Sequence, residues 1–464
     1  MIPRIVVAGT SSGAGKTTVA CGLIGALRAR GLVVQGFKVG PDYIDPSHHA
    51  LASGRPGRNL DAFLSGPDLI APLLRHGSAG ADIAVIEGVM GLFDGASGRG
   101  ELASTAHVAK LVGAPVLLVV DASAMARSAA AVVHGFRTFD PDLDVAGVIF
   151  NRVGSDTHEQ LLREALDPTG LPVLGALRRD DRIVTPERHL GLVPVAEREP
   201  DARVALAALT AAIGRYADVD AVTRLAADAL PSSGPVWSSQ AVRPIGRRTR
   251  IAIARGPAFS FHYEENLELL EAAGAELAGF DPILDERLPP GSDALVLAGG
   301  FPEIFGDQLA ANVRLRSHVR EFAAAGRPIL AECGGLLYLC ATLDGHDMCG
   351  VLPARASMTN RLTLGYREAV AASPTPWIAA GRSVRGHEFH YSALEPLDPV
   401  ASSAWTLSTR HFERPDGIVR RAVQAGYLHV HWAAHPDLAQ AFVLASAGSP
   451  TVAARPTPIE PTEP

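Results

Sequence analysis

The chain has 464 residues, more than one hydrophobic core usually supports, so we expect two or more domains. An apolar content of 47% with 20% charged residues is ordinary for a soluble globular protein. The net charge of −7 predicts no basic surface for nucleic acid or anionic lipid, and no apolar run reaches the length of a membrane span. These properties favour a cytoplasmic protein with no nucleic acid and no membrane as partners. They leave the oligomeric state open, with a homodimer as one option.

The first half of the chain alternates short β-branched runs with helix-like segments. Near-continuous apolar runs are typical of parallel strands that are buried on both faces. The stretch Thr17–Arg30 carries its apolar side chains on one stripe, as an amphipathic helix does. This alternation predicts an α/β fold with a doubly wound, mostly parallel sheet. The expected strands are Arg4–Gly9, Val33–Gly40, Ile83–Gly88, Val116–Ala122, Val145–Val153 and Val173–Leu177.

A glycine-rich turn, GTSSGAGKTT, follows the first expected strand and opens a helix. This is the context of a P-loop, in which backbone N–H groups surround phosphates, Lys16 reaches them and the Thr17 hydroxyl binds Mg²⁺. Thr10 stands where the strict motif has its first glycine and Gly9 lies one place earlier, a variant that resembles the dethiobiotin-synthetase and MinD-like branch. We therefore expect ATP as co-substrate and Mg²⁺ as cofactor. The expected nucleotide contacts in this loop are Gly13, Gly15, Lys16, Thr17 and Thr18.

Polar segments follow the next two expected strands, FKVGPDYIDPSHH and VIEGVMGLFDG. Ligands of open parallel sheets bind at the carboxyl ends of the strands, where carboxylates can hold Mg²⁺. Helix capping is the alternative for Asp42 and Asp45, and we expect it to explain at most one of them. His48 and His49 are adjacent and make a poor metal pair, so substrate contact or surface exposure is expected. The remaining polar candidates in these segments are Lys38, Tyr43, Glu87 and Asp94.

Asn151 closes another expected strand, VAGVIFNRV. It is interpreted either as a reader of the adenine edge or as a turn residue.

A change of composition separates the two halves of the chain. Periodicity gives way to Pro, Gly, Ser and charged residues, which predicts a linker over 231–248 between a synthase domain at 1–230 and a second domain at 249–447. The tail 448–464 is rich in proline and is expected to be disordered. The second domain is expected to have strands at Ile251–Ala254, Ala294–Ala298 and Pro328–Glu332, followed by several antiparallel strands to about Trp432.

The four cysteines form no disulfide framework and show no C-x-x-C spacing. Cys21, Cys340 and Cys349 are interpreted as core or loop thiols. Cys333 differs, because a buried strand runs directly into it and a Gly-Gly pair then leads a helical run, which is the layout of a nucleophile elbow. A position near a helix N-terminus lowers the pKa of a thiol and favours thiolate. The sequence therefore predicts acyl transfer through a thioester that releases ammonia from a carboxamide.

A thiolate nucleophile needs a base, and the segment AGYLHVHW offers two histidines. His429 and His431 are expected on one strand with their side chains on one face. Zinc binding is the alternative, supported only by the pair His387 and His390 in GHEFHYS. Gly299 and Gly300 end another strand, where their N–H groups are candidates for an oxyanion hole.

Seven motifs in this order resemble the cobyrinic acid a,c-diamide synthase family, including the form that acts on hydrogenobyrinic acid. They are GTSSGAGKTT, KVGPDYIDPSHH, EGVMGLFDG, PERHLGL, AGGFPE, AECGG and GYLHVH, and the likeness runs from about residue 3 to 440. It implies a dethiobiotin-synthetase-like domain followed by a class I, triad-type glutamine amidotransferase domain. Such ligases amidate the a and c acetate carboxylates of a corrin polycarboxylate with ATP and glutamine, in cobalamin biosynthesis.

The resemblance also implies residue roles. Asp45 and Glu87 match the magnesium-side carboxylates, together with the Thr17 hydroxyl, and Cys333 matches the nucleophile. Alignment of the last motif favours His429 as the base and keeps His431 open. The glutamate that follows this histidine by two places in other class I enzymes is absent, because His431 stands there. Nucleotide contacts also include Lys38 and Asn151, and the predicted substrate-side residues are Asp42, Tyr43, His48, Asp94, Gly299 and Gly300.

Three other functions remain open on the sequence. One is a sister amidotransferase that acts on another tetrapyrrole carboxylate, such as cobyric acid synthase or nickel-sirohydrochlorin diamide synthase. The second is a P-loop regulatory ATPase with a vestigial thiol domain, against which the AECGG elbow argues. The third is a zinc hydrolase that uses the paired histidines. The segments DYIDPSHH and PERHLGL favour the a,c-diamide synthase by resemblance only.

Overall fold

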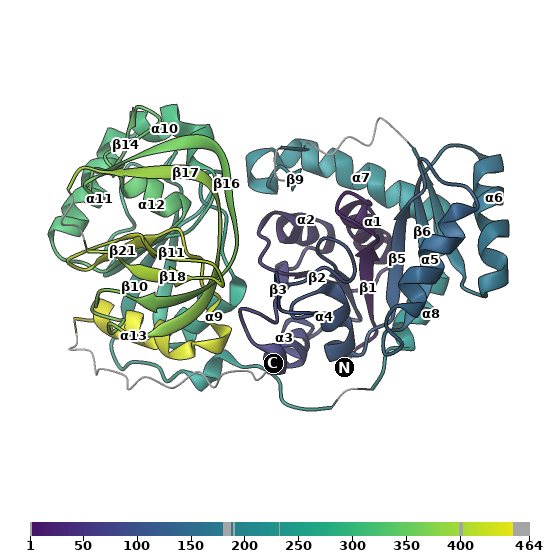
Figure 1. Ribbon diagram of the computed structural model, residues 1–464. Coiled ribbons are helices and arrows are strands. Elements are labelled where there is room, and N and C mark those ends of the chain that lie inside the picture. The colour runs from purple at the N-terminus through teal and green to yellow at the C-terminus, as the bar shows by residue number, and fades with distance from the viewer. Residues whose placement is uncertain (1, 180–186, 189–190, 232, 399–401, 449–464) are drawn as a thin grey trace. The chain divides into compact units, whose positions relative to one another are not determined.

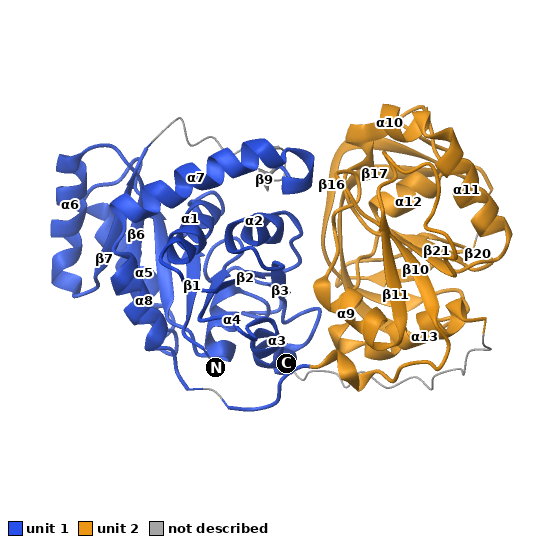
Figure 2. Cartoon of the chain, turned by 180° about the vertical axis from the view of Figure 1, so that it is seen from behind, with its two compact units in different colours: residues 1–237 blue, residues 238–464 orange. Residues whose placement is uncertain are grey.

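The computed structural model describes residues 2–179, 187–188, 191–231, 233–398 and 402–448 (Figure 1). The chain forms two compact units, residues 1–237 and 238–464, shown in blue and orange in Figure 2. Of the motif at 186–192, the described residues form the two-residue strands β8 (Glu187–Arg188) and β9 (Gly191–Leu192). Except for Gly448, the proline-rich tail lies outside the described residues.

The first unit contains a parallel sheet with helices on both faces, as predicted. Its strand order among the described residues is β3-β2-β4-β1-β5-β6-β7, with all neighbouring strands parallel. The strands are β1 (Arg4–Gly9), β2 (Val34–Val39), β3 (Arg58–Leu60), β4 (Ile83–Glu87), β5 (Val116–Asp121), β6 (Val145–Val153) and β7 (Val173–Arg178). The helices are α1 (Lys16–Ala29), α2 (Ile44–Ser53), α3 (Pro67–Gly77), α4 (Thr105–Val112), α5 (Ser128–Thr138), α6 (Asp156–Leu166), α7 (Glu199–Tyr216) and α8 (Val219–Ala227).

Apolar periodicity explains how these elements pack. Every residue of β1 and β2 is buried, as expected for parallel strands covered on both faces, and this includes the polar side chains of Arg4, Gln35 and Lys38. Leu23 and Leu27 of α1 join one core cluster with Val7 of β1 and Ile213 of α7. Burying one such side chain contributes about 1.5–3 kcal/mol. The core thus fixes the start of α1 at the carboxyl edge of the sheet.

Hydrogen bonds and packing contacts hold the end of the first unit against its sheet and against α3. The buried guanidinium of Arg4 donates to the carbonyls of Val112, Gly113 and Leu230. Beyond residue 230, the Trp237 N–H donates to the Pro72 carbonyl at 3.1 Å. The indole of Trp237, 7% exposed, lies edge-on to His76 at 4.8 Å. Part of the stretch interpreted as a linker is therefore packed against the first unit.

The second unit contains a mostly parallel sheet and a mostly antiparallel one, in which β14 pairs with β16 in parallel. Among the described residues, the mostly parallel sheet has the order β11-β10-β12-β13-β21-β20, in which only β20 is antiparallel to its neighbour. Its strands are β10 (Thr249–Ala254), β11 (Ala275–Phe280), β12 (Ala294–Leu297), β13 (Ile329–Glu332), β20 (Ile418–Arg420) and β21 (Val423–Gly426). The other sheet contains β14 (Thr342–Leu343), β15 (His346–Asp347), β16 (Ala354–Ala371), β17 (Ser383–Pro396), β18 (Trp405–Ser408) and β19 (Glu413–Asp416). The helices are α9 (Glu264–Ala272), α10 (Gly306–Ala311), α11 (Val313–Ala324), α12 (Gly334–Leu339) and α13 (Pro436–Ser446).

Two predictions for the second unit differ from the structure. The edge strand β11 was not expected. The prediction that one strand carries both histidines of GYLHVH is wrong, because β21 ends at Gly426, before either histidine. The Asp416 carboxylate accepts the N–H groups of Tyr427 at 3.0 Å and Leu428 at 3.3 Å, so these groups leave the ladder and the chain turns away from the sheet.

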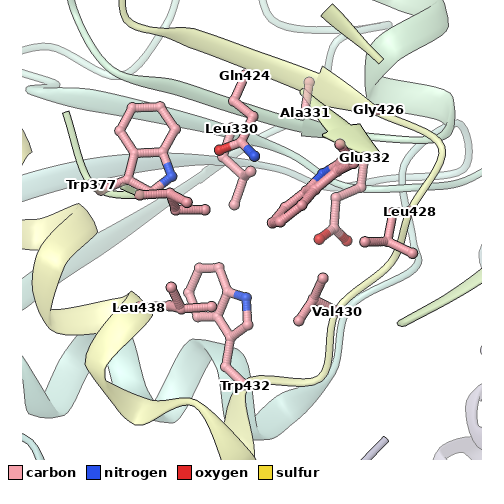
Figure 3. Close-up of a pocket in the computed structure, with 12 residues that line it drawn as sticks. Leu330, Ala331, Glu332, Trp377, Gln424, Gly426, Leu428, Val430, Trp432 and Leu438 are labelled. Carbon is pink, nitrogen blue, oxygen red and sulfur yellow. The ribbon is translucent and has the colours of Figure 1, made fainter. Parts of the chain in front are cut away.

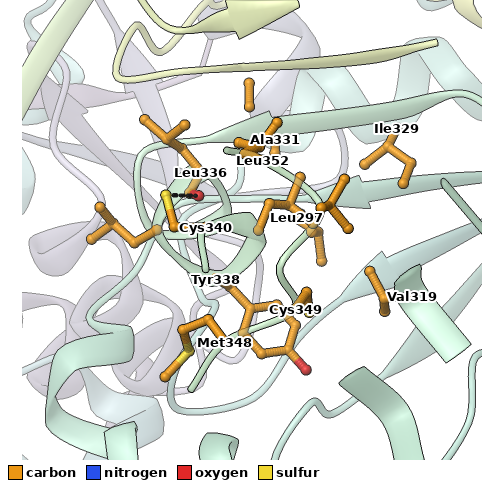
Figure 4. Close-up of a cluster of buried hydrophobic side chains, with 14 of the residues drawn as sticks. Leu297, Val319, Ile329, Ala331, Leu336, Tyr338, Cys340, Met348, Cys349 and Leu352 are labelled. Carbon is orange, nitrogen blue, oxygen red and sulfur yellow. Dashed lines mark hydrogen bonds between the residues drawn. The ribbon is translucent and has the colours of Figure 1, made fainter. Parts of the chain in front are cut away.

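The core of the second unit encloses all three of its thiols, and for Cys340 and Cys349 this agrees with the prediction of core or loop thiols. Cys340 and Cys349 are fully buried in a cluster with Tyr338, and Figure 4 shows the Cys340 Sγ bonded to the Leu336 carbonyl at 3.3 Å. Within the described parts of the chain, no helix combines the length and the apolar character needed to cross a bilayer.

Candidate active site

The P-loop lies between β1 and α1. Gly13 and Gly15 have φ values of 75° and 101°, a backbone region in which a side chain is strained. A Cβ on Gly15 would also lie 2.0 Å from the Asn151 amide nitrogen. The loop therefore needs glycine at position 15 for two independent reasons.

Lys16 folds back over the loop that it follows. Its ammonium donates to the Ser11 carbonyl at 3.0 Å and to the Met90 carbonyl at 2.6 Å. Burial, followed by the nearby charge of Lys38, lowers the pKa of Lys16 to about 8. At neutral pH the side chain is therefore mainly charged, which suits an anionic ligand.

A buried ionic cluster lies beside the loop, where β2 and β4 end. Lys38 is paired in register with Glu87 and donates to its carboxylate at 2.8 Å, and it also contacts Asp45. The Thr17 hydroxyl donates to Glu87 at 2.6 Å and lies 3.5 Å from Asp45. These four predicted residues are brought together.

The charges of this cluster depend on one another. Burial alone would raise the pKa of Glu87, but Lys38 and His49 outweigh it and hold that pKa well below its usual range. Burial, with the charges of Asp42 and Glu87, raises the pKa of Asp45. Burial would lower the pKa of Lys38, yet the charges of Asp45 and Glu87 raise it. Lys38 thus stays charged as the internal counter-ion.

His49 belongs to the cluster, and the sequence interpretation missed it. Both adjacent histidines are buried, so surface exposure is wrong for each of them. His49 Nε2 lies 2.6 Å from the Glu87 carboxylate, whereas His48 Nε2 lies 3.0 Å from the Val193 carbonyl. The available signal was spacing, because Asp45 and His49 are four residues apart and share one face of α2.

The other predicted residues of this unit have protein partners of their own. The Asp42 carboxylate accepts the N–H groups of Ile44 and Asp45, so it caps α2. The Asp94 carboxylate accepts the Gly91 N–H at 2.9 Å, and the Asn151 amide donates to the Ala14 carbonyl at 3.0 Å. Tyr43 is buried at the start of α2. Substrate contact at Asp42, Tyr43, His48 and Asp94, and nucleotide contact at Asn151, stay predictions.

A cavity of about 300 Å³ opens over the loop and the cluster. The predicted residues that line it are Gly13, Gly15, Lys16, Thr17, Thr18, Asp42, Asp45 and His48. Cys21, Arg152 and apolar residues of α7 line it as well, and none of these was proposed as a site residue. The donor set fits Mg²⁺, because this ion prefers oxygen ligands, retains several waters and binds with only one or two carboxylates plus phosphates.

Cys333 forms the turn between β13 and α12. Its φ of 47° and ψ of −101° are unusual for a residue with a side chain, and such strain is typical of a nucleophile elbow. The Cys333 N–H donates to the Gly426 carbonyl at 2.8 Å, which ties the turn to β21. Burial raises the pKa of this thiol, with smaller contributions from Glu303 and Glu332, although the Gly334 N–H acts in the opposite direction. The expected lowering is therefore wrong for the free protein, because burial outweighs the helix N-terminus.

The predicted glycines lie next to this turn. A Cβ on Gly334 would lie 3.0 Å from the Gly300 nitrogen, so Gly300 approaches the residue after the thiol. A Cβ on Gly299 would lie 2.5 Å from His429 Cε1. A side chain at 299 would therefore collide with the imidazole, and one at 334 would be tightly packed against the Gly300 backbone.

The two candidate bases have different surroundings. His429 exchanges two backbone hydrogen bonds with His387, whose ring stacks on it at 4.9 Å, and its Nδ1 lies 3.4 Å from the Glu332 carboxylate. His431 Nδ1 accepts the Ala433 N–H, and its Nε2 lies 3.4 Å from the Glu265 carboxylate. Both nitrogens of His431 therefore face groups other than the thiol.

The histidines of GHEFHYS lie near the same site with different contacts. His387 Nε2 is hydrogen-bonded to the Tyr263 hydroxyl at 3.0 Å, and His390 stacks on Tyr427 at 3.6 Å. Over the described ranges, no group of three or more His, Cys, Asp or Glu side chains is arranged to hold a metal ion. The paired histidines thus gain no further ligand of this kind among those residues.

Comparison with known families matches both units. Residues 5–193 match the CobQ/CobB/MinD/ParA nucleotide binding domain. Residues 250–437 match the CobB/CobQ-like glutamine amidotransferase domain. The α/β architecture predicted for each half of the chain is confirmed.

Curated relatives extend the likeness over nearly the whole chain. It is 54% identical to the hydrogenobyrinate a,c-diamide synthase of Streptomyces coelicolor, over 95% of this chain and 97% of the relative. It is 51% identical to the enzyme of the same name from Mycobacterium bovis, with the same coverage of both chains. It is 47% identical to the cobyrinate a,c-diamide synthase of Syntrophotalea carbinolica, over 95% of this chain and 98% of the relative.

Proposed function

This chain belongs to the family of hydrogenobyrinate and cobyrinate a,c-diamide synthases, and we propose that it amidates the a and c acetate carboxylates of hydrogenobyrinate in cobalamin biosynthesis. The reaction makes it a carbon–nitrogen ligase with ATP as co-substrate and glutamine as amido donor. The 54% identity to a hydrogenobyrinate enzyme over 95% of the chain carries the proposal. The joint presence of a P-loop and a thiol elbow supports it, because each serves one half-reaction.

The first half-reaction activates a carboxylate that is otherwise unreactive toward ammonia. A carboxylate oxygen of the corrin side chain attacks the γ-phosphorus of ATP, the bond to the β-phosphate bridging oxygen breaks, and an acyl phosphate and ADP form. Lys16 would stabilise the charge on the transferring phosphoryl group, which is chiefly a positioning and electrostatic task. Ammonia then attacks the acyl carbon, phosphate leaves, and the nitrogen loses a proton to give the amide.

Magnesium would bind with the nucleotide at Thr17, Asp45 and Glu87 and would supply neutralising charge to the phosphates. In the structure the Lys38 ammonium contacts both the Asp45 and the Glu87 carboxylates. The Thr17 hydroxyl donates to Glu87 as well. His49 fixes the other Glu87 oxygen at 2.6 Å, so the carboxylate cannot rotate freely. These contacts support the proposal, because they restrict the Glu87 carboxylate before any metal binds.

The second half-reaction releases ammonia at Cys333. The thiol proton passes to His429, the sulfur attacks the carboxamide carbon of glutamine, and the proton then moves to the departing nitrogen to give ammonia and a thioester. Water hydrolyses the thioester to glutamate and the free thiol. The N–H groups of Gly300 and Gly334 are the proposed stabilisers of the oxyanion, because Gly334 follows the thiol residue and the Gly300 nitrogen would lie 3.0 Å from a Cβ on Gly334.

Glutamine hydrolysis by wild type, Cys333→Ser and the matched core-thiol variant Cys340→Ala tests this function. The assay is run with and without ATP, Mg²⁺ and hydrogenobyrinate. We expect wild type and Cys340→Ala to release glutamate faster when all three are present, and Cys333→Ser to release none. Equal glutamate release by Cys333→Ser would overturn the thiol assignment.

A second arm tests the substrate by mass analysis of the corrinoid product. We expect two successive mass decreases of about 1 Da, each replacing a hydroxyl by an amino group. Hydrogenobyrinate and its cobalt-containing counterpart are compared at equal concentration, and the cobalt-free ring is expected to react faster. No product from either ring would refute the corrin assignment and favour another carboxylate.

A further inference from the structure

The base of a cysteine amidotransferase needs a partner that fixes its tautomer and stabilises its charged form. Here the position two residues after His429 is another histidine, His431, whose two ring nitrogens lie against the Ala433 N–H and the Glu265 carboxylate. A carboxylate from elsewhere in the fold must therefore supply any third member. Glu332, the residue immediately before the nucleophile, has a carboxylate 3.4 Å from His429 Nδ1.

The His429 ring is held so that this contact has a defined direction. Its backbone carbonyl accepts the His387 N–H at 3.1 Å, and its N–H donates to the His387 carbonyl at 2.9 Å. The His387 ring stacks nearly parallel to it, at 15°, and the backbone of Gly299 lies against Cε1. With Nδ1 toward Glu332, the second nitrogen, Nε2, is the one available to the thiol proton.

The surroundings of Glu332 strengthen its effect on an imidazolium. Glu332 lines a small cavity of about 20 Å³. Figure 3 shows its carboxylate among the other side chains that line this cavity. The remaining lining is largely aromatic and aliphatic, contributed by Trp377, Trp405, Leu428, Val430, Trp432 and Leu438. The imidazole and the carboxylate side chains are 1% and 15% exposed. A charge pair in such a low-dielectric site interacts more strongly than one in water.

One strand end positions all three groups. Glu332 is in register with Gly426, and the Cys333 N–H bonds to the same glycine. His429 follows Gly426 by only three residues, beyond the point where Asp416 turns the chain out of the sheet. The β13–β21 pairing thus delivers nucleophile, base and carboxylate to one place.

We propose that Glu332 is the positioning residue for His429, replacing the carboxylate that other class I amidotransferases carry after their histidine. It directs Nδ1–H toward itself and stabilises the imidazolium that forms when His429 takes the Cys333 proton. This inference rests on the proposed glutaminase activity at Cys333.

The test compares Glu332→Gln, Glu332→Asp and Glu265→Gln, the last removing the equivalent charge beside His431. We expect Glu332→Gln to lower kcat for glutamine hydrolysis about 10²–10⁴-fold, as loss of an orienting carboxylate does elsewhere, with KM changed less than threefold. Glu332→Asp should recover part of kcat, and Glu265→Gln should lower it less than Glu332→Gln. The opposite order of the two glutamine variants would transfer the role to Glu265 and His431.

Alkylation of Cys333 by iodoacetamide separates positioning from a merely structural or electrostatic effect. Removing a nearby negative charge by itself favours thiolate and would speed alkylation. Loss of a stabilised imidazolium instead slows it at pH 7 by about tenfold or more, with wild type and variant converging at high pH, where hydroxide deprotonates the thiol. Equal or faster alkylation of Glu332→Gln at pH 7 would overturn the inference. Glutamate release by Cys333→Ser would instead overturn the proposed function beneath it.

Discussion

The buried cluster at Lys38 predicts a large loss of stability for one isosteric change, Glu87→Gln. Glu87 is fully buried and accepts hydrogen bonds from Thr17, Lys38 and His49 at 2.6–2.8 Å. Glutamine keeps the shape and most of the hydrogen-bonding capacity, so the change removes mainly charge. The Lys38 ammonium then keeps Asp45 as its contacting counter-charge, with a smaller contribution from Asp42, in a buried site.

The magnitude follows from the cost of leaving a buried charge short of a partner, about 3–5 kcal/mol. Since Asp45 remains, we take the lower end, about 3 kcal/mol. For a folding unit of 150–250 residues, each kcal/mol shifts Tm by about 2–4 °C, so the decrease should be about 6–12 °C. The double variant Lys38→Met/Glu87→Gln should lose less than the sum of the single changes.

Calorimetry of the full chain measures this effect. The transition of the first unit is the one that ATP with Mg²⁺ raises in wild type. Glu199→Gln is the matched control, because Glu199 pairs with Arg203 at 2.5 Å with both side chains more than half exposed, and we expect it to cost at most about 1 kcal/mol. If Glu87→Gln melts within 2 °C of Glu199→Gln, the buried-charge argument is refuted.

Three further changes test other parts of the structure. Lys16→Ala should reduce diamide formation about 10²-fold or more with an unchanged circular dichroism spectrum; near-normal turnover would remove Lys16 from phosphoryl transfer. Gly299→Ala adds a Cβ 2.5 Å from His429 Cε1 and should lower glutaminase kcat/KM at least about tenfold, checked by steady-state kinetics. Burial, then the charge of Glu388, raises the pKa of Asp416 to about 6, above its unfolded value near 4, so wild type loses up to about 3 kcal/mol as pH rises from 4 to 6. The free energy of unfolding, measured with urea at pH 5 and 7.5, should fall with pH in wild type but not in Asp416→Asn. The same fall in both proteins would show that another group causes the pH dependence.

The local pattern of apolar and polar residues was sufficient to predict most strands of the first unit. Buried parallel strands such as β1 and β4 are continuous apolar runs, and each ends in polar residues that the topology brings to one edge. The three-residue strand β3 (Arg58–Leu60) left no such pattern, because it is too short to show periodicity. The edge strand β11 (Ala275–Phe280) was missed because its interior residues are only partly buried or exposed.

The site was harder to predict where it depends on contacts between distant segments. His429 and His431 alternate in sequence as on a strand, but Asp416, more than ten residues earlier, takes the preceding N–H groups and ends the ladder. The contact between Glu332 and His429 joins residues far apart in the chain, and only the β13–β21 pairing creates it. The thiol pKa was misjudged because sequence reveals a helix N-terminus but not the depth of burial around it.

The fastening of the chain beyond Leu230 has a practical consequence for dividing the enzyme. A fragment cut where the composition changes, near residue 230, would discard Trp237 and the carbonyls of Ser233 and Pro235 that receive the Arg75 guanidinium. The His76 ring of α3 would then lose its contact with Trp237, and Arg75 would lose these two carbonyl acceptors. A separately expressed ATP-binding half should therefore extend through Trp237, so that any loss of activity reports the missing partner half instead of a damaged edge.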